Sequence, residues 1–197
     1  MITEKVVDVT GNRFWSVISE PDEYPVTVEE IKEFARIDGN DEDSILESFL
    51  IGAISDVEAY LRRSLVTRSY RMVLDEWNFR EIEIPMPPLQ SVTKVVTIDE
   101  EDVETEYSSD QYYTISSSIP GRLQIKMGYS LPSNTEREKA GHAIDFTAGY
   151  GGAEDIPKQI KIGIMQLVTM IYENRAMMEE IPNEVKKILR PFKVVRI

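Results

Sequence analysis

The stretch that most constrains the fold runs from Ala143 to Met178. Its first residues read as a strand, a run of glycines follows, and the longest and most apolar helical pattern of the chain comes next. We expect Asp155 to cap this helix and Pro157 to lie in its first turn, where a missing N–H costs no hydrogen bond. The stretch therefore predicts a strand, a glycine turn and a long helix, in that order.

The long helix is apolar on more than one face. One stripe of apolar residues runs from Ile160 to Tyr172, while Ile162, Met165 and Met170 lie off that stripe. A helix of this kind is expected to be buried on more than one side, either by its own chain or by a neighbouring copy.

Two helices are predicted before residue 65. The first follows a capping box of Thr27 and Glu30 and turns Val28, Ile31 and Phe34 inward. The second covers about residues 42–63 and is capped by Asn40 or Asp41, with Glu58 among its outward charges. Its inward residues at helical spacing are Ile45, Leu46, Phe49, Leu50, Ala53, Ile54, Val57 and Leu61.

From Leu65 the apolar period changes from about 3.6 to 2, which indicates strands. After the long helix, Asn183 is expected to cap a short last helix at 184–189, which Pro191 stops. The N-terminal arm carries turn signals and one short alternating piece that suits an edge strand. The strands are expected at 66–74, 81–85, 92–98, 103–107, 111–115, 122–126 and 142–147. We expect 92–98 and 103–107 to form one hairpin and 111–115 and 122–126 to form another.

This order of patterns predicts an α+β fold. It consists of a helical bundle, with two N-terminal helices, one long central helix and one short C-terminal helix, and an inserted antiparallel β subdomain. We expect five parts: an extended arm (1–25), a first helical part (26–64), the β-rich insertion (65–148), a second helical part (149–190) and a tail (191–197).

Composition narrows the function. The 197 residues include no cysteine, which excludes disulfides and thiolate chemistry, and no apolar run is long enough for a membrane span or signal core. We therefore expect an intracellular site of synthesis. The net charge of −13 argues against a general nucleic-acid binder. Eleven acids lie between Glu20 and Glu47 and seven between Asp99 and Asp110, whereas Lys186 to Ile197 holds five bases.

Candidate chemistry is sparse. His142 has no nucleophile motif beside it, so we expect a surface or strand-edge imidazole rather than a catalytic base. The run from Asn40 to Asp43 lacks calcium-loop spacing, and the glycine turn lacks a phosphate-loop order, with Glu154 and Asp155 placed to repel phosphate. No catalytic, cofactor-binding or metal-binding residue is assigned, and no cofactor is expected.

Eight short stretches together resemble the head-tail connector, or adaptor, proteins of tailed bacteriophages, prophages and gene transfer agents. None is a catalytic signature, but their order and spacing over about residues 26–192 are specific. The stretches are VEEIK at 28–32 with 36–38, VEAY at 57–60 with 65–68, PPLQSV at 87–92, DQYY at 110–113, PGR at 120–122, FTAGYG at 146–151, Ile156–Pro157, and YENR at 172–175.

The resemblance implies a virion protein, made in the bacterial cytoplasm, that sits at the head-tail junction. Such a subunit would form a ring, of twelve copies, beneath the portal protein. The ring would extend the channel through which double-stranded DNA passes without specific binding, and a stopper or tail-completion protein would bind its far side. No membrane partner and no enzymatic activity are implied.

Two sets of residues follow from this interpretation as candidate contacts. Ile162, Met165 and Met170 are expected at the subunit interface, and the tail is expected to bind the portal. Two other functions remain open, namely another completion protein such as a stopper or baseplate part, and a small hydrolase that uses His142. The tail residues are Phe192, Lys193, Val194, Val195, Arg196 and Ile197.

Overall fold

The computed structural model describes residues 13–133, 137–174 and 180–194, and the chain forms two compact units. The helical unit contains residues 22–66 and the chain from residue 150 onward, and the β unit contains residues 67–149 together with the segment that ends at Pro21. The fold is mixed α+β, with antiparallel sheets inserted between helices, as the sequence predicts. The alternating piece of the N-terminal arm that was expected to form an edge strand, Lys5–Val9, lies outside the described residues.

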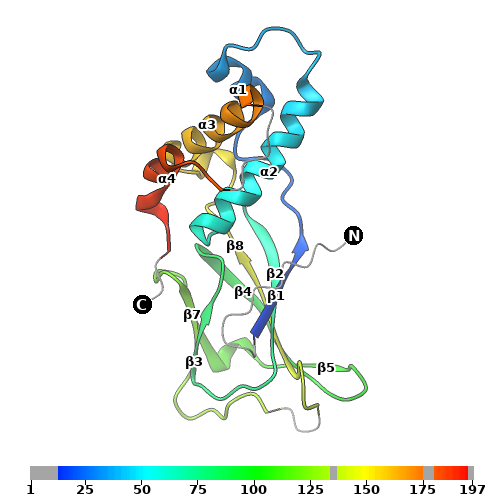
Figure 1. Cartoon of the computed structure of the whole chain (residues 1–197). Coiled ribbons are helices and arrows are strands. Elements are labelled where there is room, and N and C mark those ends of the chain that lie inside the picture. The colour runs from blue at the N-terminus through cyan, green and yellow to red at the C-terminus, as the bar shows by residue number, and fades with distance from the viewer. Residues whose placement is uncertain (1–12, 134–136, 175–179, 195–197) are drawn as a thin grey trace. The chain divides into compact units, whose positions relative to one another are not determined.

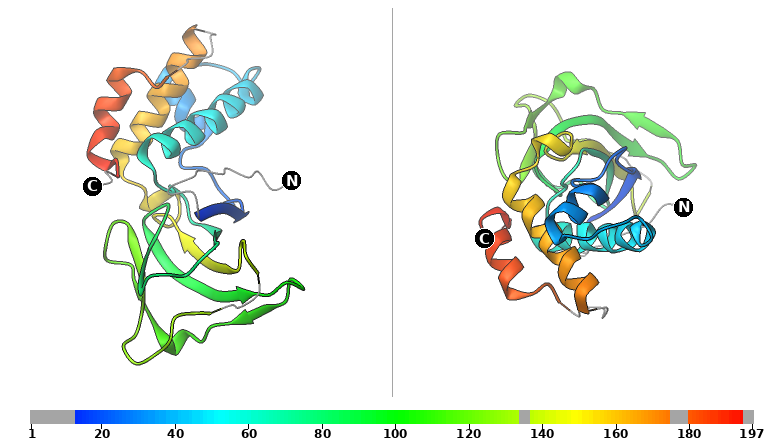
Figure 2. Two further views of the ribbon diagram at one scale, coloured as in Figure 1. Left: turned by 60° about the horizontal axis from the view of Figure 1, so that its bottom comes forward. Right: turned by 90° about the horizontal axis from the view of Figure 1, so that it is seen from above.

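Within the helical unit, α3 packs against the other three helices (Figure 1). The helices are α1 (Val28–Ala35), α2 (Asp43–Leu61), α3 (Lys158–Asn174) and α4 (Asn183–Leu189). Viewed from above, α4 and α2 lie on opposite sides of α3 (Figure 2). Ile164, Leu167 and Val168 belong to the predicted apolar stripe of α3. They share one buried core with the buried apolar residues of α2.

The start of α1 follows the predicted capping box. The Thr27 hydroxyl accepts from the Glu30 N–H at 3.1 Å, and the Glu30 carboxylate accepts from the Thr27 N–H at 2.7 Å. Ile31 is fully buried, but Phe34 is 45% exposed, so the prediction that Phe34 points inward is wrong. The helix ends at Ala35 because Arg36 adopts a left-handed conformation.

The start of α2 differs from the prediction. Glu42 occupies the cap position without a side-chain cap bond, and the Asn40 amide oxygen instead accepts from the Lys32 ammonium at 2.6 Å. The same ammonium pairs with Asp43 at 2.9 Å. Lys32 therefore connects the last turn of α1 to the start of α2, and it binds Asn40, one of the two residues that were expected to cap the helix.

Two further expectations for α2 are wrong. Ile45 is 46% exposed although it was expected inside, and Glu58 is buried although it was expected outside. The Glu58 carboxylate accepts from the Leu65 N–H at 2.8 Å, within the chain that leaves the helix. A buried carboxylate is tolerated here because it satisfies a buried backbone donor.

The glycine turn leads into α3 by way of a short 3-10 turn, η2 (Ala153–Asp155). Asp155 caps this turn, not α3, and α3 begins after Pro157. α2 has 19 residues and the described part of α3 has 17. Because residues 175–179 lie outside the described residues, the expectation that α3 is the longest helix stays a prediction. At the other end, Asn183 is the first residue of α4 and does not cap it.

The β unit contains two antiparallel sheets that share one core. The five-stranded sheet has the order β1-β2-β8-β4-β5, and the three-stranded sheet has the order β3-β7-β6. The strands are β1 (Arg13–Ser19), β2 (Arg68–Leu74), β3 (Glu81–Ile84), β4 (Leu89–Ile98), β5 (Glu104–Glu106), β6 (Tyr112–Ile115), β7 (Gly121–Ile125) and β8 (His142–Ala148). Both predicted hairpins, β4–β5 and β6–β7, are present.

The core of the β unit lies where alternate side chains of the two sheets meet. Tyr70 of β2 stacks on Phe146 of β8 with ring centroids 5.3 Å apart, and both are fully buried. Leu123 and Ile125 of β7 enter the same core from the smaller sheet. This alternation is the reason that β2 and β8 must pair in one register, because a slip of either strand by one residue would turn its ring outward.

The buried Glu58 carboxylate should contribute measurably to stability. Glu58→Ala leaves the Leu65 N–H without this acceptor, which should cost about 1–3 kcal/mol in the free energy of unfolding. Glu58→Gln keeps an acceptor oxygen and should cost less. Glu47→Ala, an exposed change in the same helix, is the control and should stay within about 0.5 kcal/mol. Urea denaturation followed by circular dichroism measures all three, and equal losses for Glu58→Ala and Glu47→Ala would contradict this role.

Candidate assembly surfaces

His142 is buried within the β unit. Its side chain is 5% exposed and lies edge-on to Trp77, with ring centroids 5.9 Å apart. The strand that carries it, β8, runs between β2 and β4, so the expected surface or strand-edge position is wrong. Burial lowers the pKa of the imidazole from its ordinary value of 6.5, because the charged form is desolvated. The ring is therefore a neutral part of the core.

The described residues contain no group of three or more His, Cys, Asp or Glu side chains that could hold a metal ion. Among the same residues, no helix has the length and hydropathy to cross a membrane.

The glycine turn satisfies its own backbone donors. The Gly152 N–H donates to the Asp155 carboxylate at 3.0 Å, and the Ala153 N–H donates to the Glu23 carboxylate at 2.8 Å. Gly151 has a φ of +138°, and a Cβ there would lie 2.1 Å from the Asp155 carboxylate. Because carboxylates already occupy these N–H groups, the turn is a structural connection and not a phosphate site.

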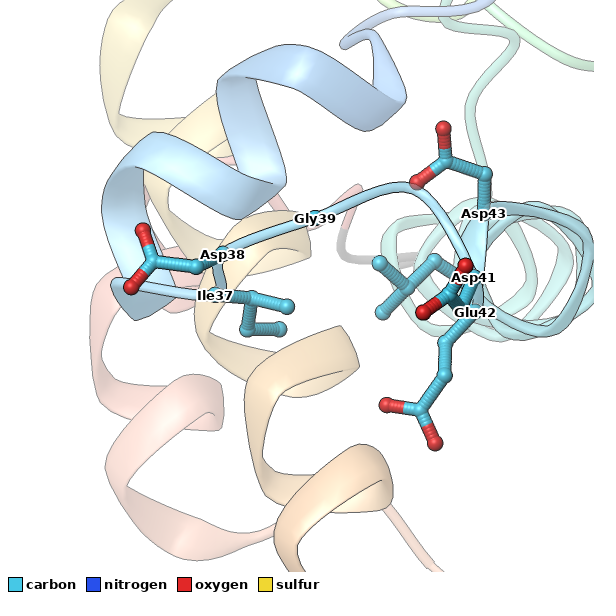
Figure 3. Close-up of a pocket in the computed structure, with 7 residues that line it drawn as sticks. Ile37, Asp38, Gly39, Asp41, Glu42 and Asp43 are labelled. Atoms are coloured by element: carbon cyan, nitrogen blue, oxygen red, sulfur yellow. The ribbon is translucent and has the colours of Figure 1, made fainter.

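An acidic hollow of about 300 Å³ lies at the loop between α1 and α2. Figure 3 shows Asp38 at one end of this loop and Asp41, Glu42 and Asp43 at the other. The Glu42 carboxylate accepts from the Tyr172 hydroxyl of α3, which ties the loop to the central helix. The hollow is lined by Ile37, Asp38, Gly39, Asp41, Glu42, Asp43 and Leu46. Such a surface repels phosphate.

The three α3 residues proposed for subunit contact do not share one environment. Ile162 is 41% exposed, whereas Met165 and Met170 are half-buried and pack against the core of their own helical unit. Of the three residues, Ile162 therefore has the most exposed side chain. Sequence periodicity alone did not separate it from the two methionines.

Other exposed apolar side chains of the helical unit were missed. Ile45 and Ile51 lie on the exposed side of α2, and Phe34 lies on α1. All three fit helical apolar spacing, so the pattern assigns them to the core as readily as to the surface. Only the positions of the neighbouring helices show that they are open.

The first part of the C-terminal tail is bound to the helical unit. The Phe192 carbonyl accepts from the Arg63 Nε at 2.5 Å, and the Val194 N–H donates to the Leu61 carbonyl at 3.0 Å. The Lys193 ammonium lies 4.1 Å from the centre of the Tyr60 ring. The remaining tail residues, Val195, Arg196 and Ile197, lie outside the described residues.

A charged network crosses the outer face of the larger sheet. Arg71 of β2 donates to the Asp145 carboxylate at 2.6 Å and to the Glu104 carboxylate at 2.7 Å, and Lys94 of β4 also donates to Glu104 at 2.7 Å. The bonds from Lys94 and Arg71 lower the pKa of Glu104, and the Asp145 bond contributes most to the raised pKa of Arg71. The network attaches β5, and with it the β4–β5 hairpin, to the sheet.

A family model described as "Phage gp6-like head-tail connector protein" matches residues 25–129, which is more than half of the chain. The chain belongs to this family. The model describes this family as one of head-tail connectors.

Solved structures similar to the connector come from gene transfer agent (GTA) particles. A chain from the "neck of empty GTA particle computed with C6 symmetry" is 23% identical with a TM-score of 0.81, and the match covers 93% of this chain and 97% of that one. A chain from the native GTA virion is 23% identical (TM-score 0.77, coverage 93% and 96%). A chain from the native neck with C12 symmetry is 22% identical (0.78, 93% and 97%). At these identities the likeness shows a shared fold.

A comparison with curated proteins gave no match. The family of the chain is therefore assigned from the family model, and the likeness of its fold from the solved structures.

The buried imidazole makes the stability of the connector depend on pH. Because the folded protein lowers the pKa of His142 below 6.5, the unfolded chain binds a proton first as pH falls, and that proton favours unfolding. The contribution is complete above pH 6.5 and is lost toward acid. His142→Phe should therefore show a shallower fall in unfolding free energy between about pH 7.5 and about pH 5.5, measured by urea denaturation. Parallel curves for the two proteins would contradict the assignment of a buried neutral imidazole.

Proposed function

We propose that this connector is a structural subunit of a ring beneath the portal, where it extends the DNA channel and joins the head to the tail. The observation that carries the proposal is the family match over residues 25–129. The fold likeness to a chain of a gene transfer agent neck covers 93% of the chain and therefore extends beyond the residues that the family model matches.

A ring requires each copy to present two different surfaces to its two neighbours. The connector has exposed apolar side chains for such a contact in the helical unit, at Ile162 on α3 and at Ile45 and Ile51 on α2. Figure 2 shows α2 on one side of α3 and α4 on the other. The two sides of the helical unit therefore present different helices. We propose twelve copies, a number compatible with the C12 symmetry used for the similar neck.

The acidic surface supports the channel role. The acidic loop between α1 and α2 and the acidic β4–β5 hairpin both contribute to the net charge of the chain, which is −13. Like charge keeps a phosphate backbone from binding to the wall, so DNA can pass without being held. In this proposal double-stranded DNA is a passenger and not a ligand.

The portal and a stopper or tail-completion protein are the proposed partners. The basic segment from Lys186 to the C-terminus is proposed to bind the portal, by charge or by strand addition. Lys187 and Arg190 are exposed in this segment, while Lys186 is paired with Glu180 at 2.7 Å. The proposed location is the head-tail junction of the virion, after synthesis in the bacterial host.

Ring formation can be tested with one pair of isoleucines. The wild-type protein, alone and with purified portal, should form rings by light scattering and negative-stain imaging. Ile162→Asp should raise the concentration needed for assembly at least tenfold, because a carboxylate would be desolvated in the contact. Ile119→Asp makes the same change at a comparably exposed site in the β unit and should leave rings intact. Rings from Ile162→Asp at the wild-type concentration would exclude this contact, and a wild-type protein that never forms rings would exclude the proposed function.

Portal binding can be tested by a truncation that spares the folded part of the tail. Ending the chain after Val194 removes Val195, Arg196 and Ile197 but keeps the bonds of Phe192 and Val194 to the helical unit. The melting temperature should stay unchanged, while the affinity for the portal should fall at least tenfold in a pull-down or interferometry assay. Full-strength portal binding by the truncated protein would refute a gripping role for these three residues.

A further inference from the structure

The tip of the β4–β5 hairpin is an ordered acidic projection. Asp99, Glu100, Glu101 and Asp102 follow one another, and the next residue, Val103, is 57% exposed. The Asp99 carboxylate accepts from the N–H groups of Glu101 at 3.1 Å and Val103 at 2.8 Å, which closes the turn. Arg137 pairs with Asp102, whereas Glu100 and Glu101 have no ion-pair partner among the described residues.

The base of this hairpin is held in place. Glu104, the first residue of β5, accepts from both Arg71 and Lys94 on the outer face of the sheet. β5 pairs with β4 from Val96 to Ile98. A projection with a fixed base and a closed tip loses little conformational freedom on binding, which favours its use as a contact.

An aromatic-basic patch lies elsewhere in the β unit. Arg80 donates to the carbonyls of Lys126 and Tyr129 at 3.2 Å, and the Lys126 ammonium lies 4.8 Å from the centre of the Tyr113 ring. The segments joined by these contacts also carry exposed apolar side chains, of which Met127 is the most open at 86%. The patch consists of Phe79, Arg80, Tyr113, Lys126, Met127 and Tyr129.

The two cations of the patch are not neutralised by their own chain. Arg80 and Lys126 bond to backbone carbonyls, and within the described residues neither forms an ion pair with a carboxylate. Arg80 is exposed and Lys126 is half-buried, and both lie beside exposed aromatic or methionine residues on a chain of net charge −13. This composition, aromatic and Met with Arg, is typical of interface cores.

The hairpin and the patch cannot meet within one copy. Figures 1 and 2 show the β4–β5 hairpin projecting on one side of the β unit and strands β3 and β7, which adjoin the patch, on the other. Arg80 directly precedes β3, and Lys126 directly follows β7. The patch lies near the end of β5, where the Tyr107 hydroxyl donates to the Ser130 carbonyl at 2.7 Å, and the hairpin tip projects away from it. Two complementary but separate surfaces on one unit can link successive copies head to tail.

We propose that the acidic hairpin tip of one copy docks on the aromatic-basic patch of the next copy. Val103 would enter the apolar part of the patch, and Glu100 and Glu101 would face Arg80 and Lys126. The inference rests on the proposed ring and adds a second contact to it, made by the β unit. Charge complementarity fixes the direction of the contact, because two hairpins or two patches repel each other.

The absence of cysteine from the chain makes a direct test possible. Under mild oxidation the double variant Val103→Cys/Met127→Cys should form a ladder of disulfide-linked chains on a non-reducing gel. A mixture of Val103→Cys copies with Met127→Cys copies should stop at heterodimers. The control Val103→Cys/Ile119→Cys places the second thiol at another exposed site, 58% exposed, outside the patch and should give at least tenfold less ladder.

A charge exchange tests the direction independently. In the double-cysteine background, Glu101→Lys should reduce the ladder at least tenfold, adding Lys126→Glu should restore it, and Glu33→Lys in α1 should leave it unchanged. Wild-type rings without a ladder from the double-cysteine variant would overturn the inference, leave the proposed function standing and assign the patch to a different virion protein. A ladder without closed rings would support the contact and contradict the proposed ring. Homodimers alone would also overturn the contact.

Discussion

The fold depends on pairing the chain where it leaves the helical unit with the chain where it returns. Within the helical unit, the Tyr150 N–H donates to the Leu65 carbonyl at 2.8 Å, and Val66 forms a parallel bridge with Gly151. Within the β unit, β2 pairs with β8 along seven residues. The insertion of residues 67–149 thus begins and ends on hydrogen-bonded backbone. Because the entropy of loop closure grows only slowly with length, a paired entry and exit can carry a long insertion at little extra cost.

The apolar excess of α3 is mostly explained by the chain itself. Three helices pack around α3, and the approach of α4 is close enough that a Cβ on Gly163 would lie 2.8 Å from Leu189. Met165 and Met170 contact the same core, which leaves Ile162 as the open apolar residue among the three candidates. A central helix therefore needs several apolar faces before any neighbouring copy is considered.

Charge is used differently in the two units. In the β unit, Arg71 and Lys94 hold Glu104, so opposite charges position a hairpin, while Glu100 and Glu101 at its tip have no ion-pair partner among the described residues. In the helical unit, Lys32 joins α1 to α2 and the neighbouring acids line a hollow. Such a distribution combines locally satisfied structural pairs with a surplus of negative surface, which repels phosphate.

The sequence by itself determined the elements and their order. The capping box of Thr27 and Glu30, the switch from a period of about 3.6 to one of 2, and the two hairpins were all predictable because each depends on residues a few positions apart. The tertiary structure decided which side chains are open. Glu58 and His142 are buried and Phe34 is exposed, against expectation, because burial depends on segments that are distant in the sequence. The hairpin tip and the aromatic-basic patch became recognisable as complementary surfaces for the same reason, since only folding brings residues 79–80, 113 and 126–129 together.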